Sequence, residues 1–386
     1  MVIMGNIVEI AFASALTLGR SFTALSTTLG RPYSVDGRTL LTERAELASW
    51  RRLTSDASVG GASRLMRAGD GWVSLTLARP DDISSLPALF HQDSTGFADD
   101  PWPNVRHLVQ SRSAAEIVAR ATLLGLSSAQ PQERSAPEAD STPFRRRSFG
   151  TSSLTKQPIV VDLSALWAGP VCANLLGHAG FHVVKVESVN RLDGARIGPA
   201  NFYNLLNAGH DSVTLDFGDR ADRAILRALC AKADVVVTAS RQRALDELGL
   251  DPASMMRENP ISAWVAISAF GPDEPDRIGF GDDAAVAGGL VATEPDGSLA
   301  YVGDAIADPL TGLTAAAAVL QSFVNRERTL IQIDLASVAA AATVEQPEQH
   351  ERPEQRCIAF PRARPVTGQA RPAGADNDTW VRRSAA

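Results

Sequence analysis

The sequence is poor in the residues that build metal centres and disulfide frameworks. Its 386 residues include three cysteines and six histidines. Cys172, Cys230 and Cys357 are far apart and odd in number, so they offer neither a disulfide framework nor a zinc-ligand spacing. The histidines show no metal-ligand spacing either. We therefore expect no bound metal and a reducing compartment, the cytoplasm.

The chain also lacks an excess of positive charge and a long apolar run. Its formal net charge is -7, which argues against broad binding to nucleic acid. No apolar run is expected to reach membrane-spanning length. Residues 1–20 lack the positive start of a secretory signal, and Glu9 interrupts their apolar stretch. We expect this segment to be a helix packed on the protein, with neither nucleic acid nor membrane as a partner.

Composition divides the chain into four parts. Residues 1–126 combine helical and alternating patterns and predict a smaller α+β domain. Residues 127–156 are rich in Ser, Pro, Gln and Arg and have no apolar period, which predicts a linker. The arginines at 145–147 are read as a solvated charge run rather than a phosphate site. Residues 157–344 form the main domain, and residues 345–386 a second linker and a tail.

In the main domain, short β-branched runs alternate with helical patterns. The runs at 159–161, 183–186, 235–237 and 263–267 are each separated by a helix-length segment. Such alternation predicts a parallel sheet covered by helices on both faces. The fold class is therefore expected to be α/β and Rossmann-like, with a smaller α+β domain beside it.

Residues 158–187 predict a strand, a tight turn, a helix and a second strand. The β-branched residues 159–161 suit a strand buried on both faces. Gly169 would allow a sharp turn, and Pro170 suits the first helical position. Free N–H groups at the start of such a helix can bind a phosphate. An ordinary crossover without a ligand stays open as the alternative.

A second candidate region surrounds Asp308, which precedes Pro309 and an alanine-rich helical pattern. Asp308 is expected to cap that helix, where the helix dipole and free N–H groups favour the ionised carboxylate. Asp251 stands before a proline in the same way with no sign of chemistry, so a purely structural role stays open. Rival nucleophiles are Asp304 and Cys172, the latter expected to face the core, where a thiol is inert.

Both regions resemble the class III CoA-transferases, the CaiB/BaiF family, over roughly half of the chain. The Ala-Gly-Pro turn combined with Val-Lys-Val-Glu carries most of the specificity of the resemblance. The matching residues, in chain order, are 162–164, 168–170, 175–176, Gly180, 183–187, Arg196, 303–304, Asp308, Thr311, Gly312 and the alanine run that follows.

The resemblance implies a transferase that moves CoA from an acyl-CoA thioester to a carboxylic acid, with CoA as substrate and no further cofactor. It implies that Asp308 attacks the thioester carbonyl to give a mixed anhydride. The CoA thiolate then forms an aspartyl-CoA thioester, from which the incoming acid takes CoA. The family forms interlocked homodimers, for which residues 127–156 and 345–356 would be the wrapping linkers. The implied CoA contacts are Leu166, Trp167, Ala168, Gly169, Arg196, Leu215, Ser240 and Arg241.

Several positions depart from the family pattern. Residues 209–211 replace the basic residues that usually precede a strand, and residues 279–283 lack the histidine of the racemase members. The small-domain pattern comes before the main domain instead of after it, and the glycine-rich oxyanion loop cannot be placed. A degenerate CoA-binding relative and an acyl-CoA racemase are therefore kept as alternatives. An NAD-dependent dehydrogenase using Glu187 ranks last, because residues 168–177 contain no G-x-G-x-x-G.

Overall fold

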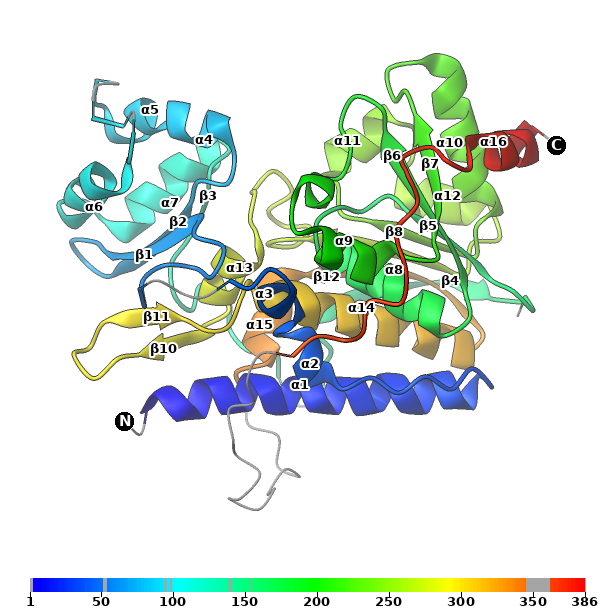
Figure 1. Ribbon diagram of the computed structural model, residues 1–386, viewed down its shortest axis with the longest axis horizontal. Helices are drawn as coiled ribbons and strands as arrows, with labels where there is room; N and C mark the ends of the chain where they lie inside the picture. Colours follow the sequence, from blue (N-terminus) through cyan, green and yellow to red (C-terminus); the bar gives the residue numbers. More distant parts are fainter. Residues whose placement is uncertain are drawn as a thin grey trace.

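A seven-stranded sheet forms the centre of the molecule, with the strand order β4-β12-β9-β8-β5-β6-β7 (Figure 1). The computed structural model describes residues 3–50, 54–93, 96–97, 99–138, 141–153, 155–344 and 362–385. All neighbouring strands are parallel except the edge strand β4, which is antiparallel to β12. The strands are β4 (Phe144–Thr151), β5 (Ile159–Asp162), β6 (His182–Ser188), β7 (Asp211–Leu215), β8 (Val235–Thr238), β9 (Ala263–Ser268) and β12 (Glu327–Asp334).

The six parallel strands have the order of dinucleotide-binding folds. Numbered along the chain from β5, they lie in the order 3-2-1-4-5-6. The order reverses between β5 and β8, and open α/β sheets bind their ligands outside the carboxyl ends of the strands at such a switch point. The segments that leave these two ends are residues 163–167 and 239–241. The predicted Rossmann-like parallel sheet is confirmed.

Both faces of the sheet are buried, because alternate residues of each strand enter different cores. Val160 and Val235 belong to the core on one face, and Val161 and Val236 to the core on the other. The first face is covered by α8 (Ala168–His178), α14 (Ala307–Val324) and α15 (Leu335–Ala341), with α1 (Ile3–Thr28) packed outside α14. The second face is covered by α10 (Arg220–Lys232), α12 (Pro252–Glu258) and α16 (Asn377–Ala385).

Helix α14 is buried along almost its whole length, because it packs against α8, α1 and α15 at once. Small residues make this spacing possible. A Cβ at Gly312 would lie 2.5 Å from the carbonyl oxygen of Ala168 in α8. The alanine-rich helix predicted after Asp308 is confirmed. Small side chains are needed along it because other helices pack closely against it on several sides.

Helix α1 runs along the outer side of α14, where Ala11, Ala15 and Phe22 are buried (Figure 1). The predicted N-terminal helix packed on the protein is confirmed. The expectation that no apolar run is long enough to cross a membrane is wrong by length and composition. Among the described residues, one helical segment, Ile7–Thr28, is long enough and apolar enough to cross a membrane. Buried helices of water-soluble proteins also meet these measures, and α1 packs against α14 on one side.

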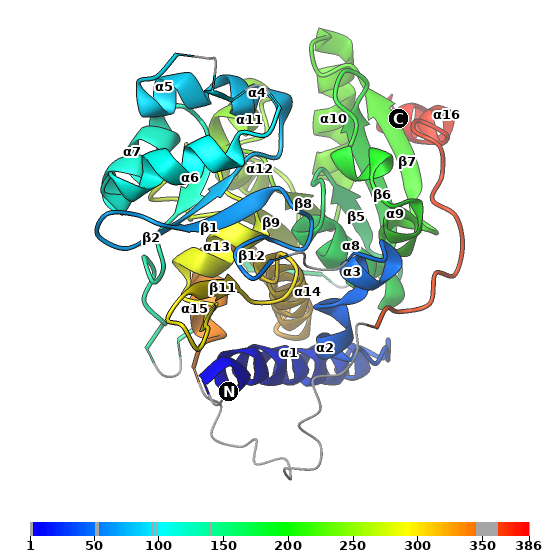
Figure 2. The same cartoon turned by 60° about the vertical axis from the view of Figure 1, so that its left-hand side comes forward.

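A smaller unit with its own core lies beside the large sheet (Figures 1 and 2). It contains an antiparallel sheet of β1 (Ser63–Arg67), β2 (Trp72–Thr76) and β3 (Ser127–Ala129) and the helices α4 (Pro80–Ser84), α5 (Leu86–Phe90), α6 (Trp102–Gln110) and α7 (Ala114–Leu123). We call it the small domain. It differs from the predicted unit of residues 1–126, because α1 buries its apolar side on α14 and so belongs with the large sheet.

The segment predicted as a linker, residues 127–156, contains β3 and the edge strand β4. The sequence signal for β4 is weak because the arginines at 145–147 are exposed and no face of the strand is fully buried. Charge on an edge strand also discourages pairing with other chains. Residues 345–361, which include the whole of the other predicted linker at 345–356, lie outside the described residues. Residues 362–385 run past α9 (Ala200–Asn207) and end in α16.

Candidate active site

The turn between β5 and α8, residues 163–167, lies at the switch point of the sheet. Leu166 has a φ of 68°, a left-handed conformation that a leucine rarely adopts. Its N–H donates to Asp193 Oδ1 at 2.9 Å, and the N–H of Leu163 donates to the carbonyl of Val237 in β8 at 2.9 Å. Trp167 is buried, whereas Leu166 is 45% exposed. The strained residue therefore faces solvent where a ligand would approach.

Gly169 is required by a close contact and not by a left-handed backbone. It lies in the first turn of α8, and the positive φ of this turn belongs to Leu166 instead. A Cβ at Gly169 would lie 2.1 Å from Ser164 Oγ and 2.2 Å from Ser164 Cβ. The predicted role of Gly169 as the point of sharp turning is thus corrected: the glycine lets α8 begin directly against Ser164.

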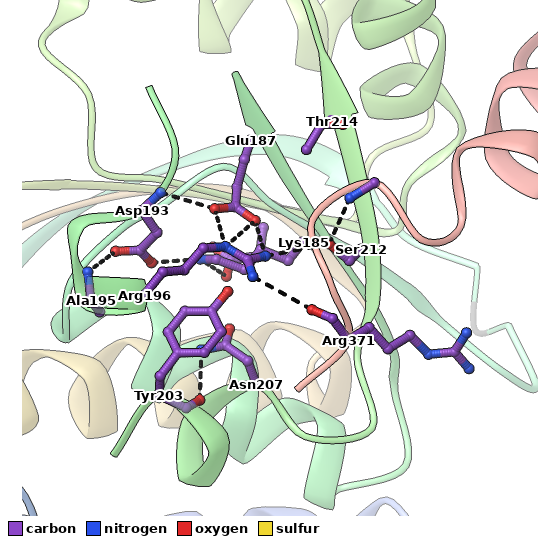
Figure 3. Close-up of polar contacts among 12 residues, drawn as sticks. Lys185, Glu187, Asp193, Ala195, Arg196, Tyr203, Asn207, Ser212, Thr214 and Arg371 are labelled. Carbon is purple, nitrogen blue, oxygen red and sulfur yellow. Dashed lines mark hydrogen bonds and ion pairs between the residues drawn. The ribbon is translucent and has the colours of Figure 1, made fainter. Parts of the chain in front are cut away.

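Buried charges behind the turn hold it in place (Figure 3). We call Asp162, Lys185, Glu187, Asp193 and Arg196 the Lys185 cluster. Lys185 Nζ lies 3.0 Å from Asp193 Oδ2 and 3.6 Å from Asp162 Oδ2, and it donates to the carbonyl of Ser164 at 3.0 Å. Lys185 thereby connects the end of β5, the turn and the loop after β6.

Most of the carboxylates of the Lys185 cluster are held by cations and N–H donors. Burial alone would raise the pKa of Asp193, but Lys185 and the N–H groups of Ala195 and Leu166 hold it below its ordinary value. For the fully buried Asp162, burial outweighs the attraction of Lys185 and raises the pKa. The cluster is a structural support for the turn, because Lys185 and the three carboxylates are buried and the partly exposed Arg196 is paired with Glu187.

Arg196, predicted to contact CoA, is engaged within this cluster. Its Nε donates to Glu187 Oε1 at 2.9 Å and its Nη2 to Glu187 Oε2 at 2.5 Å. The guanidinium carbon lies 4.7 Å from the centroid of the Tyr203 ring. Glu187, the residue that a dinucleotide would need for its ribose, also accepts the N–H of Asp193 at 2.9 Å. Both side chains are thus occupied within the protein.

The remaining predicted CoA contacts divide into two groups. Ala168 is nearly buried at the start of α8, and Ser240 and Arg241 are exposed directly after β8, the strand next to β5. These residues lie at the same edge of the sheet as the turn. Leu215 is buried at the end of β7, in the core on the α10 face. The structure therefore brings all the predicted positions except Arg196 and Leu215 to the switch point, where Leu166, Ser240 and Arg241 are exposed and Trp167, Ala168 and Gly169 are buried.

Asp308 is the second residue of α14 and not its cap, because the helix begins at Ala307. The prediction of an N-cap with Pro309 at the first helical position is corrected: the helical backbone starts earlier, and Ile306 takes the cap position. A Cβ at Gly281, the first residue of α13 (Gly281–Ala287), would lie 2.2 Å from Asp308 Oδ2. The carboxylate of Asp308 therefore packs against the backbone of Gly281, and the N–H of Gly281 donates to it.

Three further charged side chains surround Asp308. We call Arg44, Asp282, Asp304 and Asp308 the Asp308 cluster. Arg44 Nε donates to Asp304 Oδ2 at 2.9 Å and its Nη2 to Asp304 Oδ1 at 2.5 Å. Asp282 Oδ1 accepts the N–H of Ala305 at 3.0 Å. Three carboxylates thus share one cation.

This imbalance changes the ionisation of the carboxylates. Burial raises the pKa of Asp308 to about 7, with the negative charges of Asp282 and Asp304 adding to the effect and Arg44 opposing it. Burial and Asp304 likewise raise the pKa of Asp282 to about 6. The predicted preference of the helix N-terminus for the ionised form is opposed here by burial, the largest influence, and by the neighbouring carboxylates, which together raise the pKa of Asp308.

The turn and the Asp308 region lie close together. Ala168, the first residue of α8, contacts Gly312, one helical turn beyond Asp308. On the other side, the guanidinium carbon of Arg44 lies 4.4 Å from the centroid of the Trp167 ring. The two candidate regions of the sequence, more than a hundred residues apart, are thus brought together by the packing of α8 on α14 and by Arg44.

The rival nucleophiles are less accessible than Asp308. Asp304 is 2% exposed and is held by both nitrogens of Arg44. Cys172 is fully buried in α8, and burial raises the pKa of its thiol well above the ordinary range. Asp308 remains partly exposed. Accessibility therefore favours Asp308 among the three.

The small domain is attached to α13 next to this site. Asp283 accepts hydrogen bonds from Ser74 at 2.8 Å, from Thr76 at 2.9 Å and from Ser127, all in the small sheet. The neighbouring Asp282 accepts one from Ser63 at 3.2 Å. Strands β1, β2 and β3 thus each place a hydroxyl on the two aspartates that precede the Asp308 region.

Sequence reasoning missed Arg44, Asp282, Asp193 and Lys185 as site residues. Lys185 lies two residues before Glu187 and Asp193 six residues after it. A lysine inside a strand that is otherwise apolar needs a buried partner, so the pair could have been predicted. Asp282 stands in the Gly-Phe-Gly-Asp-Asp stretch, which attracted attention only for its missing histidine. Arg44 is 260 residues from its partner Asp304 and had no local signal.

Comparison with known proteins shows the family to which the chain is similar. The family model described as CoA-transferase family III matches residues 156–376. The succinyl-CoA–D-citramalate CoA-transferase of Chloroflexus aurantiacus is 30% identical over 181 residues, which are 44% of this chain and 45% of that protein. The human alpha-methylacyl-CoA racemase is 35% identical over 113 residues, 29% of this chain and 27% of that protein. A CaiB/BaiF family protein from Brucella suis has a TM-score of 0.45 and 30% identity over 49% of this chain and 55% of that one. The chain spans about half the length of the curated relatives it matches.

Proposed function

The chain belongs to CoA-transferase family III, and on that premise we propose that it moves CoA from an acyl-CoA thioester to a carboxylic acid. The observation that carries this proposal is the contact of α14 with α8, which places Asp308 beside the turn at the switch point. A nucleophilic carboxylate next to a nucleotide-type binding turn is the arrangement that acyl transfer from CoA requires.

The proposed chemistry begins with the ionised carboxylate of Asp308. One of its oxygens attacks the thioester carbonyl, and the CoA thiolate leaves as the mixed anhydride forms. The thiolate then attacks the aspartyl carbonyl and releases the carboxylate of the first acid, which leaves CoA on Asp308 as a thioester. The carboxylate of the second acid attacks this thioester, and the departing thiolate attacks the new anhydride to give the product acyl-CoA and free Asp308. Charge and atoms balance without an oxidant or reductant.

The environment of Asp308 supports this role. A pKa of about 7 leaves a substantial part of the carboxylate ionised at neutral pH and makes it a stronger nucleophile than an ordinary, more acidic carboxylate. The N–H of Gly281 is a donor close to the reacting oxygens. The indole N–H of Trp167 is buried without a hydrogen-bond partner among the described residues and is a second donor at the turn.

CoA is proposed to bind across the switch point, on the turn residues Leu166–Gly169 and on Ser240 and Arg241 after β8. Arg196 takes part only if it leaves Glu187, and Leu215 only through its backbone. Replacing Gly169 by valine is expected to abolish CoA binding, because the side chain would enter the space of Ser164. Calorimetric titration with CoA measures this, with circular dichroism as the check on folding. Unchanged CoA affinity in a folded valine variant would place the site elsewhere.

The decisive experiment traps the acylated carboxylate. Incubation with succinyl-CoA or acetyl-CoA and hydroxylamine is expected to give a hydroxamate on the peptide that contains Asp308. Asp308→Asn, shown to be free of deamidation, is expected to fold, bind CoA and give no adduct. An adduct on Asp304, or full activity in the asparagine variant, would contradict the assignment. CoA binding with no adduct from any acyl-CoA would favour the degenerate relative.

A racemase is the second candidate, because part of the chain matches the human racemase. Gly281 stands in the stretch where racemase members carry a histidine, and a side chain there would collide with Asp308 and with the carbonyl of Ala305. The geometry therefore favours transfer over proton abstraction by an Asp–His pair. Exchange of the α-proton of a 2-methylacyl-CoA for deuterium, without CoA transfer, would reverse this ranking.

We also propose that the protein acts as a homodimer in the cytoplasm, on acyl-CoA and carboxylic acid substrates. Support comes from the family membership. Sedimentation is expected to give a dimer at micromolar concentration. A dilute monomer that remains fully active would exclude this part of the proposal.

A further inference from the structure

Arg44 reaches the site from a part of the chain that the family model does not cover. The family model matches residues 156–376, whereas Arg44 lies in α3 (Glu43–Leu47), close to the N-terminus. Figures 1 and 2 place α3 between the small domain and α9. The contacts of this short helix therefore have to be explained from this chain alone.

The guanidinium of Arg44 has neighbours on its edge and on its faces. Its edge carries the two hydrogen bonds to Asp304, at 2.9 and 2.5 Å. Its central carbon lies 4.4 Å from the ring centroid of Trp167 and 5.6 Å from that of Trp50. A planar, permanently charged group held by a bidentate carboxylate and an aromatic face is fixed in orientation.

Two ion pairs anchor α3 itself. Next to Arg44, Glu43 is fully buried and accepts from Arg364 Nε at 2.8 Å and Nη2 at 2.9 Å. Arg364 also donates to Asn174 in α8 at 2.7 Å. Adjacent residues of one helix thus make two bidentate pairs, of which only the Arg44 pair contains a member of the Asp308 cluster.

We infer that Arg44 is a positioning residue of the proposed CoA-transfer site, which fixes Asp304 and Trp167 and supplies the positive charge that keeps Asp308 reactive as a carboxylate. The inference rests on the proposed function for its catalytic meaning, but its electrostatic part is independent of turnover. The charged groups that act on Asp308 are Arg44 from α3, Asp282 from α13 and Asp304 from the loop before α14. Arg44 is the cation among them.

The sign of each substitution follows from these charges. Arg44→Gln removes the attraction that lowers the pKa of Asp308, so protonation of Asp308 is expected to have its midpoint at higher pH than in the wild type. Asp304→Asn removes a repulsion and leaves the charge of Arg44 uncompensated, so the midpoint is expected at lower pH. Arg44→Lys keeps the charge and is expected to stay close to the wild type. A role limited to packing would not produce opposite shifts.

The experiment reads the titration of Asp308 from stability, so it needs no activity. The free energy of unfolding is measured from pH 5 to 9 with and without Asp308→Asn, in the wild-type, Arg44→Gln, Arg44→Lys and Asp304→Asn backgrounds. In each background, the stability difference made by Asp308→Asn grows as the pH rises and levels off at the folded-state pKa of Asp308, and the pH at which it levels off is the midpoint sought. Arg364→Gln is the matched control, since it breaks an equally buried bidentate pair on the same helix and is expected to lower stability without moving the midpoint.

Hydroxamate formation at Asp308 is then compared in the same buffers. At pH 6.5, Arg44→Gln is expected to react about three- to tenfold more slowly than the wild type because less of the carboxylate is ionised, with near-equal rates for Arg44→Lys. If Arg44→Gln does not fold, two variants still test the inference. The protonation midpoint of Asp308 should move to lower pH in Asp304→Asn and stay close to the wild-type value in Arg44→Lys. Equal midpoints in all backgrounds, or an equal shift in Arg364→Gln, would overturn the inference. Absence of hydroxamate in the wild type would overturn the proposed function alone.

Discussion

The Lys185 cluster and the Asp308 cluster are both buried groups of three carboxylates, yet they differ in their cations. The first has Lys185 and Arg196 for Asp162, Glu187 and Asp193, whereas the second has Arg44 alone for three aspartates. The pKa of Asp193 is held low, and that of Asp308 is raised to about 7. Burial is common to both and also raises the pKa of Asp162 in the first cluster, so the supply of positive charge explains the contrast between Asp193 and Asp308 rather than between all members of the two clusters.

Removing the cation of the first cluster is expected to have the largest effect on stability. Lys185→Met leaves Asp162 and Asp193 buried without their shared partner, which costs about 3–5 kcal/mol for a broken buried ion pair. Urea denaturation at pH 7.5 measures the loss. A decrease below about 1 kcal/mol would show that the Lys185 cluster does not support the turn and would remove the contrast between the clusters.

Neutralising one carboxylate in each cluster is expected to change stability in opposite directions. Asp308 has a raised folded-state pKa, so its charge destabilises the protein above about pH 7, and Asp308→Asn should be more stable than the wild type at pH 8 by about 1–3 kcal/mol. This difference shrinks towards about pH 4, where the carboxyl is protonated in the folded protein and increasingly also in the unfolded chain.

Asp193→Asn should show the reverse pattern. The lowered folded-state pKa of Asp193 stabilises the protein above its unfolded-state pKa of about 4, and this stability is lost as the pH falls through the lower, folded-state value. The variant should therefore be less stable than the wild type at pH 8. Unfolding curves at pH 4 and pH 8 test both variants together, and the same sign for both at pH 8 would contradict the comparison.

The smallest expected effect is that of Asp282→Asn. Asparagine keeps an oxygen that can accept the N–H of Ala305 but removes one negative charge near Asp308. The protonation midpoint of Asp308 should therefore move to lower pH, with a change in stability at pH 7 of about 1 kcal/mol or less. The unfolding series described for Arg44 measures it. An upward shift would show that Asp282 does not face Asp308 as a charge.

The sequence predicted the sheet better than the charges around the site. Buried strands such as β5 and β8 are short β-branched runs, so each was evident locally. The edge strand β4 was missed because its exposed arginines carry no alternating pattern. Asp308 was found through a family resemblance, and its position beside the turn follows from the packing of α8 on α14.

The ionisation of Asp308 could not be predicted from its neighbours in sequence. A helix N-terminus alone favours the charged form, but the groups that decide the pKa include Arg44, Asp282 and Asp304. Two of these are separated from Asp308 by loops and whole elements. For Arg196 the reverse holds: its position matched the family, yet the nearby Glu187 engages its guanidinium. Pairing among charges is a property of the folded chain.

The contact between Gly312 and the carbonyl of Ala168 has a mechanical consequence. Because α8 and α14 meet backbone to backbone there, the turn and Asp308 belong to one rigid body whose internal spacing is fixed. The small domain is joined to that body near the site through buried side-chain hydroxyls on Asp282 and Asp283 rather than through a close backbone contact of this kind. Admission of a bulky acyl chain is therefore expected to move the small domain against α13 and to leave the distance between bound CoA and the carboxylate unchanged.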